Sequence, residues 1–324
     1  MHRHPSRLRR ALLAAPIAAV AARALAADDF PSRLVRLVVP YPPGGTSSTI
    51  ANLLSQQLQP AGVQLVVDYK PGAGGNIGVD NVLKSPPDGY TIGFTAMNSF
   101  AINPHLTKKL PYDVASDVQL ITVIGGVPNI VVVHPDVKAT NLRELVALSR
   151  TSDLTYASPG AGTSPHLTGE LLASEAGLKM RHVPYRGESP ALQDVLGGRV
   201  PVMVANLTGL TEYVRSGKVR PIAVTSSARS AVFPQVPTVA ESGVAGFDVR
   251  GYFVLFTARG VPAPALDKLN RELNKVIAGT VFREQMGKLG LEPAGTTIEA
   301  ATALAASEYK RWGDVVRRTG ASWD

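Results

Sequence analysis

The chain carries LVRLVVPYPPGGTSS at residues 34–48 and LVVDYKPGAGGNIG at residues 65–78. Each stretch places an apolar strand, a glycine loop and the start of a helix pattern in succession. Glycine has no Cβ, so the backbone of such a loop can approach a bound group closely. The N–H groups that open the following helix have no partner within it and form an anion site. Two such loops so close in the sequence predict a cleft that holds a small, negatively charged molecule.

The rest of the chain alternates strand and helix patterns almost to its end. Strands are predicted at 90–95, 130–133, 154–157, 180–183, 200–204, 221–224 and 251–257, and helices at 141–150, 165–176, 190–196, 210–216, 264–279, 281–290 and 298–318. This alternation predicts an α/β fold with mostly parallel sheets and helices on both faces. The order of strands and loops predicts two lobes, residues 27–128 plus 249–324 and residues 129–248. Ligands of open α/β sheets lie beyond the carboxyl ends of the strands, so we expect the loops of the two lobes to face each other across a cleft.

Residues 1–26 have the composition of a secretory signal peptide. Four arginines and no acidic residue occupy residues 1–10, an apolar stretch follows at 11–22, and Ala24-Leu25-Ala26 is a small-x-small cleavage site. The apolar part is too short to span a membrane. We therefore expect an exported, soluble mature protein that begins at Ala27. Arg9-Arg10 also fits a twin-arginine signal, although the general secretory route is favoured.

Composition excludes several classes of function. The leader holds five arginines and no acidic residue, so of the 33 basic and 25 acidic side chains 28 and 25 remain after cleavage. No basic block with interleaved aromatic residues occurs, which argues against a nucleic-acid partner. The chain has no cysteine, which excludes disulfides and thiolate metal sites. The histidines beyond the leader share no metal-ligand spacing, so we expect neither a metal nor a cofactor.

Seven motifs follow one another along the mature chain. They are YPPGG at 41–45, PGAGGNIG at 71–78, PDGYT at 87–91, YASPG at 156–160, SPHL at 164–167, HVPYRG at 182–187 and LGGRV at 196–200. Together they resemble the periplasmic solute-binding proteins of tripartite tricarboxylate transporters, the Bug family. The resemblance implies a two-lobed, type II periplasmic-binding-protein fold that closes on a small carboxylate-bearing solute. It further implies a monomeric delivery protein in the periplasm that serves the permease subunits of a transporter and is not an enzyme.

The candidate ligand-binding residues lie in these motifs, at the helix starts and at the strand ends. They are Tyr41, Pro43, Gly44, Gly45, Thr46, Ser48, Gly74, Gly75, Asn98, Ser99, Ser158, Gly160, Gly162, Thr163, Ser164, His166, Tyr185, Arg186 and Asn206. Backbone N–H groups and hydroxyls of this kind suit a carboxylate. Arginine is more often surface-exposed than buried, so we expect backbone donors rather than Arg186 to carry the affinity. The glycine pairs also fit tight turns without a ligand, and residues 185–187 also fit an ordinary strand end.

Two positions depart from the pattern of the family. Ser48 and Asn206 stand where relatives commonly carry an aspartate. If both face the cleft, the site is less hostile to extra carboxylates and less suited to an ammonium group.

Other functions were weighed against solute binding. A secreted serine hydrolase would use Ser164 or Ser158 as nucleophile and His166 or His182 as base, but the chain has no G-x-S-x-G elbow. A phosphate- or nucleotide-binding module would need the G-x-x-x-x-G-K-[ST] motif, which is also missing. A solute sensor for a signalling partner is the alternative to a transport receptor.

Overall fold

The computed structural model describes residues 30–107 and 109–320. The predicted signal peptide, residues 1–26, lies outside the described residues. The strands are β1 (Val35–Val39), β2 (Leu65–Tyr69), β3 (Thr91–Ala96), β4 (Val118–Val133), β5 (Leu154–Ser158), β6 (Met180–Pro184), β7 (Val202–Asn206), β8 (Arg220–Val224), β9 (Arg250–Ala258) and β10 (Glu292–Pro293). The helices are α2 (Thr46–Leu58), α3 (Asn76–Leu83), α4 (Asn98–Ala101), α5 (Asn103–Leu106), α6 (Val114–Asp117), α7 (Leu142–Ser149), α8 (Ser164–Ala176), α9 (Glu188–Leu196), α10 (Leu207–Arg215), α11 (Ala263–Ala278), α12 (Thr280–Lys288) and α13 (Ile298–Thr319).

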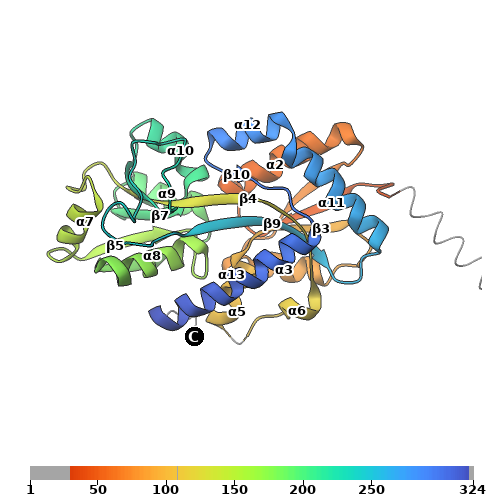
Figure 1. Cartoon of the computed structure of the whole chain (residues 1–324), viewed down its shortest axis with the longest axis horizontal. Coiled ribbons are helices and arrows are strands. Elements are labelled where there is room, and N and C mark those ends of the chain that lie inside the picture. Colours follow the sequence, from red (N-terminus) through yellow and green to blue (C-terminus); the bar gives the residue numbers. More distant parts are fainter. Residues whose placement is uncertain (1–29, 108, 321–324) are drawn as a thin grey trace, which may run out of the picture.

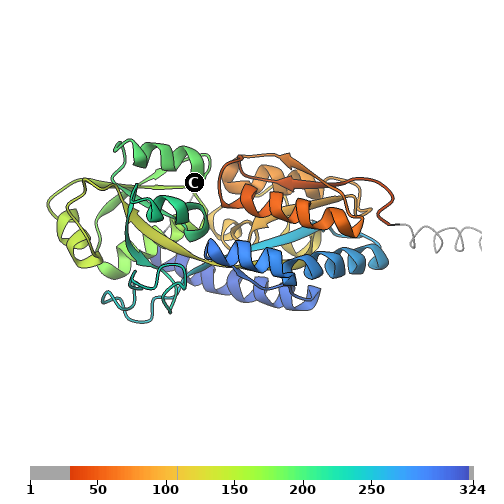
Figure 2. The same ribbon diagram turned by 90° about the horizontal axis from the view of Figure 1, so that it is seen from above.

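The strands form two sheets that share the long strand β4. In the first, the order β2-β1-β3-β9-β4 ends with β10 on β4, and in the second β4 is followed by β7, β5 and β6, with β8 also paired to β4. Figures 1 and 2 show the resulting halves side by side, which we call the first and second lobe after these sheets. Strands β1, β2 and β3 are parallel, as are β5, β6 and β7.

The prediction of mostly parallel sheets is wrong for the centre of the molecule. Strand β9 is antiparallel to both β3 and β4, and β4 is antiparallel to β7, β8 and β10. The chain leaves the first lobe along β4 and returns along β9, so the two strands run in opposite directions and pair directly. Each sheet is therefore mixed.

Strand β4 is also much longer than the predicted strand at 130–133. Gly125, Gly126 and Pro128 interrupt the apolar pattern and resemble a turn in the sequence. In the structure both glycines lie within β4. The adjacent strands β9 and β10 approach them so closely that a larger residue would not fit. A Cβ on Gly125 would lie 2.5 Å from the carbonyl oxygen of Glu292 in β10, and one on Gly126 would lie 3.2 Å from the ring of Tyr252 in β9.

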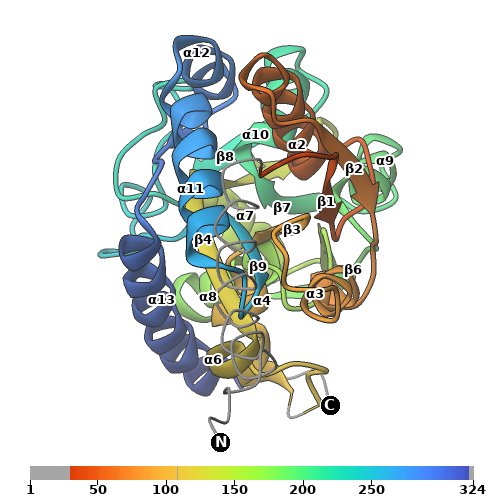
Figure 3. The same ribbon diagram turned by 90° about the vertical axis from the view of Figure 1, so that its right-hand side faces the viewer.

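The inner strands β1, β4 and β9 are mostly buried on both faces, whereas the outer strands β2 and β6 are partly exposed. Successive side chains of a strand point to opposite faces, so Leu37 and Val39 of β1 join one apolar cluster while Val38 joins the other. Helix α11 packs on β4 and α2 in the first lobe, and α13 contacts α4 and α5 as well as α8 of the second lobe. Figure 3 shows α11, α12 and α13 on one side of the molecule, away from β1 and β2. Helix α11 thus packs on the first lobe, whereas α13 contacts helices of both lobes.

Candidate functional site

The first glycine loop, at the start of α2, is held by hydrogen bonds between its own residues. The N–H of Gly44, which has a φ of +95°, donates to Ser48 Oγ at 2.8 Å. The Ser48 hydroxyl donates in turn to the carbonyl of Gly45 at 2.9 Å. Ser48 therefore holds the loop in shape, and its side chain is absent from the lining of the cavities described below.

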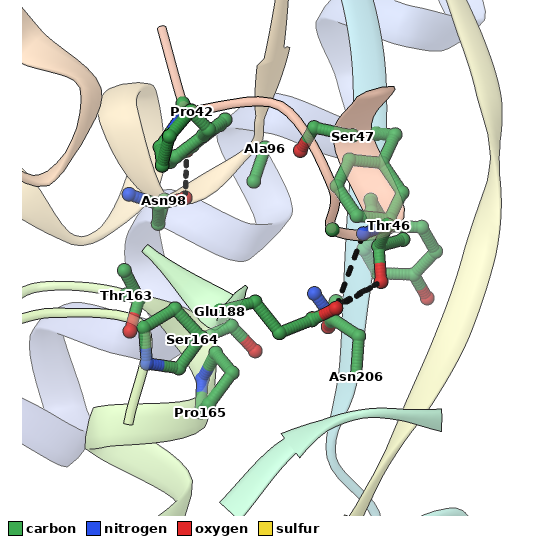
Figure 4. Close-up of a pocket in the computed structure, with 16 residues that line it drawn as sticks. Pro42, Thr46, Ser47, Ala96, Asn98, Thr163, Ser164, Pro165, Glu188 and Asn206 are labelled. Atoms are coloured by element: carbon green, nitrogen blue, oxygen red, sulfur yellow. Dashed lines mark hydrogen bonds between the residues drawn. The ribbon is translucent and has the colours of Figure 1, made fainter. Parts of the chain in front are cut away.

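The N-terminus of α2 already holds a carboxylate, that of Glu188 at the start of α9 in the second lobe. The Thr46 N–H donates to Glu188 Oε1 at 3.1 Å, and the Thr46 hydroxyl donates to Oε2 at 3.1 Å. Figure 4 shows the Glu188 side chain between Ser164 and Pro165 on one side and Thr46 and Asn206 on the other. Burial raises the pKa of Glu188 to about 7, although the hydrogen bonds from Thr46 favour the charged form. The N-terminus of α2, where the sequence predicts an anion site, thus bonds a side chain of the second lobe across the cleft.

A second contact joins the lobes beside Glu188. The Ser189 hydroxyl donates to the carbonyl of Pro43 at 3.4 Å. A Cβ on Gly44 would lie 2.8 Å from Ser189 Oγ, and one on Gly187 would lie 2.4 Å from the ring of Pro42. The loops of the two lobes do face each other.

Asn98, at the start of α4, ties the two glycine loops of the first lobe together. Its Oδ1 accepts from the hydroxyl of Tyr41 at 3.3 Å, and its Nδ2 donates to the carbonyl of Gly74 at 3.2 Å. Burial raises the pKa of Tyr41, so the phenol stays neutral. Gly75 has a φ of +106°, and a Cβ there would lie 3.1 Å from the hydroxyl of Tyr41 and 3.3 Å from that of Ser99. Gly75 is therefore required for packing between the loops.

The loop before α8 forms the opposite wall. Thr163 is the N-cap of α8: its hydroxyl accepts from His166 N–H at 3.4 Å and donates to the carbonyl of Gly160 at 2.7 Å. The N–H of Gly162 donates to His166 Nδ1 at 3.1 Å, so it is not free for a ligand. The Asn129 amide of β4 donates to Ser164 Oγ at 3.1 Å. This wall is held in place by hydrogen bonds within the second lobe.

Two cavities lie between these loops. The inner one has a volume of about 40 Å³ and is lined by Tyr41, Pro42, Gly45, Thr46, Ser47, Ala96, Asn98, Pro159, Thr163, Ser164, Pro165, Glu188, Asn206, Gly251, Tyr252 and Phe253. The outer one has a volume of about 380 Å³ and is lined by Pro40, Tyr41, Pro42, Pro71, Gly72, Ala73, Gly74, Gly75, Pro159, Gly160, Ala161, Pro184, Tyr185, Arg186 and Gly187. Only Glu188 carries a formal charge among the inner residues, and only Arg186 among the outer ones.

The structure brings most of the predicted site residues to these cavities. The inner cavity receives Tyr41, Gly45, Thr46, Asn98, Thr163, Ser164 and Asn206. The outer cavity receives Tyr41, Gly74, Gly75, Gly160, Tyr185 and Arg186. Neither is lined by the remaining seven predicted residues, which are Pro43, Gly44, Ser48, Ser99, Ser158, Gly162 and His166.

Sequence reasoning missed Glu188, Asn129 and the aromatic pair Tyr252 and Phe253. An acidic residue in the first turn of a helix has an ordinary explanation in the helix dipole, so Glu188 gave no distinct signal. Its place directly after HVPYRG was the available clue. The interpretation of Ser48 and Asn206 as a loss of negative charge from the cleft is incomplete, because Glu188 supplies a carboxylate there.

The serine–histidine pair considered for a hydrolase is present in part. Ser158 Oγ and His182 Nε2 are 2.7 Å apart, and His182 stacks on His166 with ring centroids 4.0 Å apart. Burial lowers the pKa of His166 to about 4, and burial together with His166 lowers that of His182 to about 3. Both rings are neutral at pH 7, which makes His182 a poor base. Ser158 is buried, and within residues 30–107 and 109–320 no carboxylate bonds to His182.

The described residues contain no group of three or more His, Cys, Asp or Glu side chains placed to hold a metal ion. None of their helices combines the length and the apolar character needed to cross a membrane.

Comparison with known proteins identifies the family. The sequence model described as "Tripartite tricarboxylate transporter family receptor" matches residues 48–321. The protein BugT of Bordetella pertussis is 34% identical over 92% of each chain. The chain belongs to this receptor family. Its relatives in the family are solute-binding proteins, not enzymes.

Solved structures of other members of the receptor family have the same two-lobed periplasmic-binding-protein fold. The R. palustris protein Rpa4515 with adipate is 31% identical, with a TM-score of 0.88 over 91% of this chain and 99% of the other. MatC from Rhodopseudomonas palustris with bound malate is 28% identical, with a TM-score of 0.82 over 89% and 100%.

Proposed function

We propose that this receptor captures a small carboxylate-bearing solute between its two lobes in the periplasm and delivers it to the membrane subunits of a tripartite tricarboxylate transporter. The observation that carries the proposal is the carboxylate of Glu188 at the N-terminus of α2. Its two hydrogen bonds from Thr46, across the cleft from α9, show that the closed cleft accommodates such a group. The two similar solved structures named above hold adipate and malate, which are both small carboxylates.

Binding needs the lobes to separate first. A cavity of about 40 Å³ has room for water but not for an organic acid. We infer that residues 27–128 plus 249–324 move as one lobe and residues 129–248 as the other. The two crossings between them are β4 near residues 127–133 and the segment that enters β9. The protein acts as a monomer in this proposal, because each chain contains both walls of the cleft.

The proposed ligand contacts are the predicted residues that line the inner cavity. The predicted residues that line the outer cavity form the entrance to the site. Ser164 offers its hydroxyl proton at the N-terminus of α8, where its Oγ already accepts from Asn129. Tyr41, Asn98 and Asn206 offer further polar groups. The predicted residues away from the cavities support the loops that carry these contacts.

A thermal-shift screen tests the proposal. Mono-, di- and tricarboxylates, aromatic acids and amino acids are compared with inorganic phosphate and nucleotides. At one hundred times its dissociation constant, a true ligand adds about 2.7 kcal/mol to the free energy of unfolding. Stabilisation by carboxylates alone supports the proposal, and stabilisation by phosphates alone contradicts it.

A further inference from the structure

Glu188 is the one carboxylate among the described residues that line the inner cavity, and no cation of the described chain pairs with it. Among the described residues that line this cavity none is lysine, arginine or histidine. Within residues 30–107 and 109–320, the hydrogen bonds to its carboxylate come from Thr46 alone. Buried carboxylates are usually paired with a cation, so Glu188 has capacity for a further positive or N–H group.

Two glycines beside Glu188 leave the space that its side chain occupies. A Cβ on Gly209, in the first turn of α10, would lie 1.6 Å from Glu188 Oε1 and 2.8 Å from Oε2. A Cβ on Gly45 would lie 3.2 Å from the Cβ of Glu188. Glycine at both positions leaves the space that the side chain fills. The carboxylate therefore lies against the N-terminal turns of α2 and α10.

The N-terminus of α8 remains available on the opposite wall. Thr163 and Ser164 line the same cavity, and Pro165 at the next position has no N–H. The partial positive charge of a helix N-terminus attracts an anion. One carboxylate of a solute can thus sit at α8, while its other end faces Glu188.

We propose that Glu188 determines the specificity of the site: it excludes a second carboxylate from the solute and selects a monocarboxylate with an ammonium or amide N–H group at its far end. This inference rests on the proposed function. Above pH 7, where Glu188 is ionised, two carboxylates brought together in a closed cleft repel each other strongly because little water screens them. An ammonium or amide group instead donates a hydrogen bond to Glu188, and such charge-assisted bonds are among the stronger ones.

Titration calorimetry with matched probes tests this selection. Each four- to six-carbon α,ω-dicarboxylate is compared with its mono-amide, which has nearly the same shape, and with the ω-amino acid of equal length. The wild-type protein is expected to bind the mono-amide or ω-amino acid at least tenfold more tightly than the dicarboxylate. In Glu188→Gln this ratio falls at least tenfold, because the glutamine keeps the shape and removes the charge.

Two further variants separate charge from position. Gly209→Ala keeps the carboxylate but forces it from its place, so the preference weakens while the protein stays folded by circular dichroism. Glu212→Gln, an exposed position on the same helix, leaves the ratio unchanged. The inference is overturned if carboxylates bind but Glu188→Gln leaves the ratio within twofold of wild type, or if the wild type prefers dicarboxylates. If no probe binds to either protein, the proposed function fails, and this inference fails with it.

Discussion

A single carboxylate, Glu188, dominates the chemistry of the cleft at the residue scale. Sequence reasoning predicted an anion site at the start of α2, because glycine loops before helices have a general physical meaning, and in the structure Thr46 bonds the Glu188 carboxylate there. It could not identify the group that occupies the site. Thr46 and Glu188 are 142 positions apart, and only the folded geometry of the two lobes brings them together.

The burial of Glu188 predicts a pH-dependent stability. Its pKa in the folded protein is about 7, against an ordinary value of 4.5, so between these values the folded state keeps a proton that the unfolded state has released. The contribution of Glu188 to the free energy of unfolding then falls as the pH rises from 4.5 through 7. The other titratable side chains that line the cavity, Tyr41 and Tyr252, have raised pKa values and stay neutral in this range.

Urea denaturation of wild type and Glu188→Gln from pH 4.5 to 8 checks this prediction. The wild type should lose about 2–3 kcal/mol relative to the variant over this range, at about 1.4 kcal/mol per pKa unit. A constant difference across the range would show that Glu188 titrates normally in the folded protein.

At the element scale, local signals predicted most helices and strands, and long-range pairing accounts for the errors. The Asn141 cap of α7 and the proline in the first turn of α8 are visible in the sequence and hold in the structure. The antiparallel centre and the length of β4 were missed, because strand direction depends on how the chain passes between the lobes. The short helices α4, α5 and α6 were also missed, since each has four residues and too few positions for a helical period.

The cap of α8 allows a test that separates stability from binding. Thr163→Ala removes the N-cap hydroxyl of a cavity-lining helix, and Thr297→Ala removes the equivalent cap of α13, away from the cavity. Each should lower the free energy of unfolding by about 1 kcal/mol. Only Thr163→Ala should also weaken solute binding, measured by calorimetry on the folded variants. Equal solute affinity of both variants would show that the N-terminus of α8 does not contact the solute.

The whole molecule combines two lobes with shared elements. Strand β4 pairs in both sheets, β9 runs beside it, and α13 contacts helices of both lobes. The resemblance predicted this two-lobed fold and its cleft, while the contents of the cleft came only from the structure. A solute that contacts both walls stabilises the closed form, because some of its contacts form only when the lobes are closed.

Small-angle scattering tests the predicted motion. A saturating carboxylate should reduce the radius of gyration if the free protein is mainly open in solution. Glu188→Ala, which loses the contact with Thr46, should be more open than wild type without ligand. An identical profile for both proteins, free and saturated, would indicate rigid lobes.

A crystal structure with the carboxylate that stabilises the protein most in the thermal-shift screen tests solute capture between the lobes most directly. The solute should lie between α2 and α8, with its carboxylate hydrogen-bonded at Ser164 and its other end near Glu188 and Thr46. A solute bound to one lobe alone, or held only by Arg186 in the outer cavity, would contradict the account.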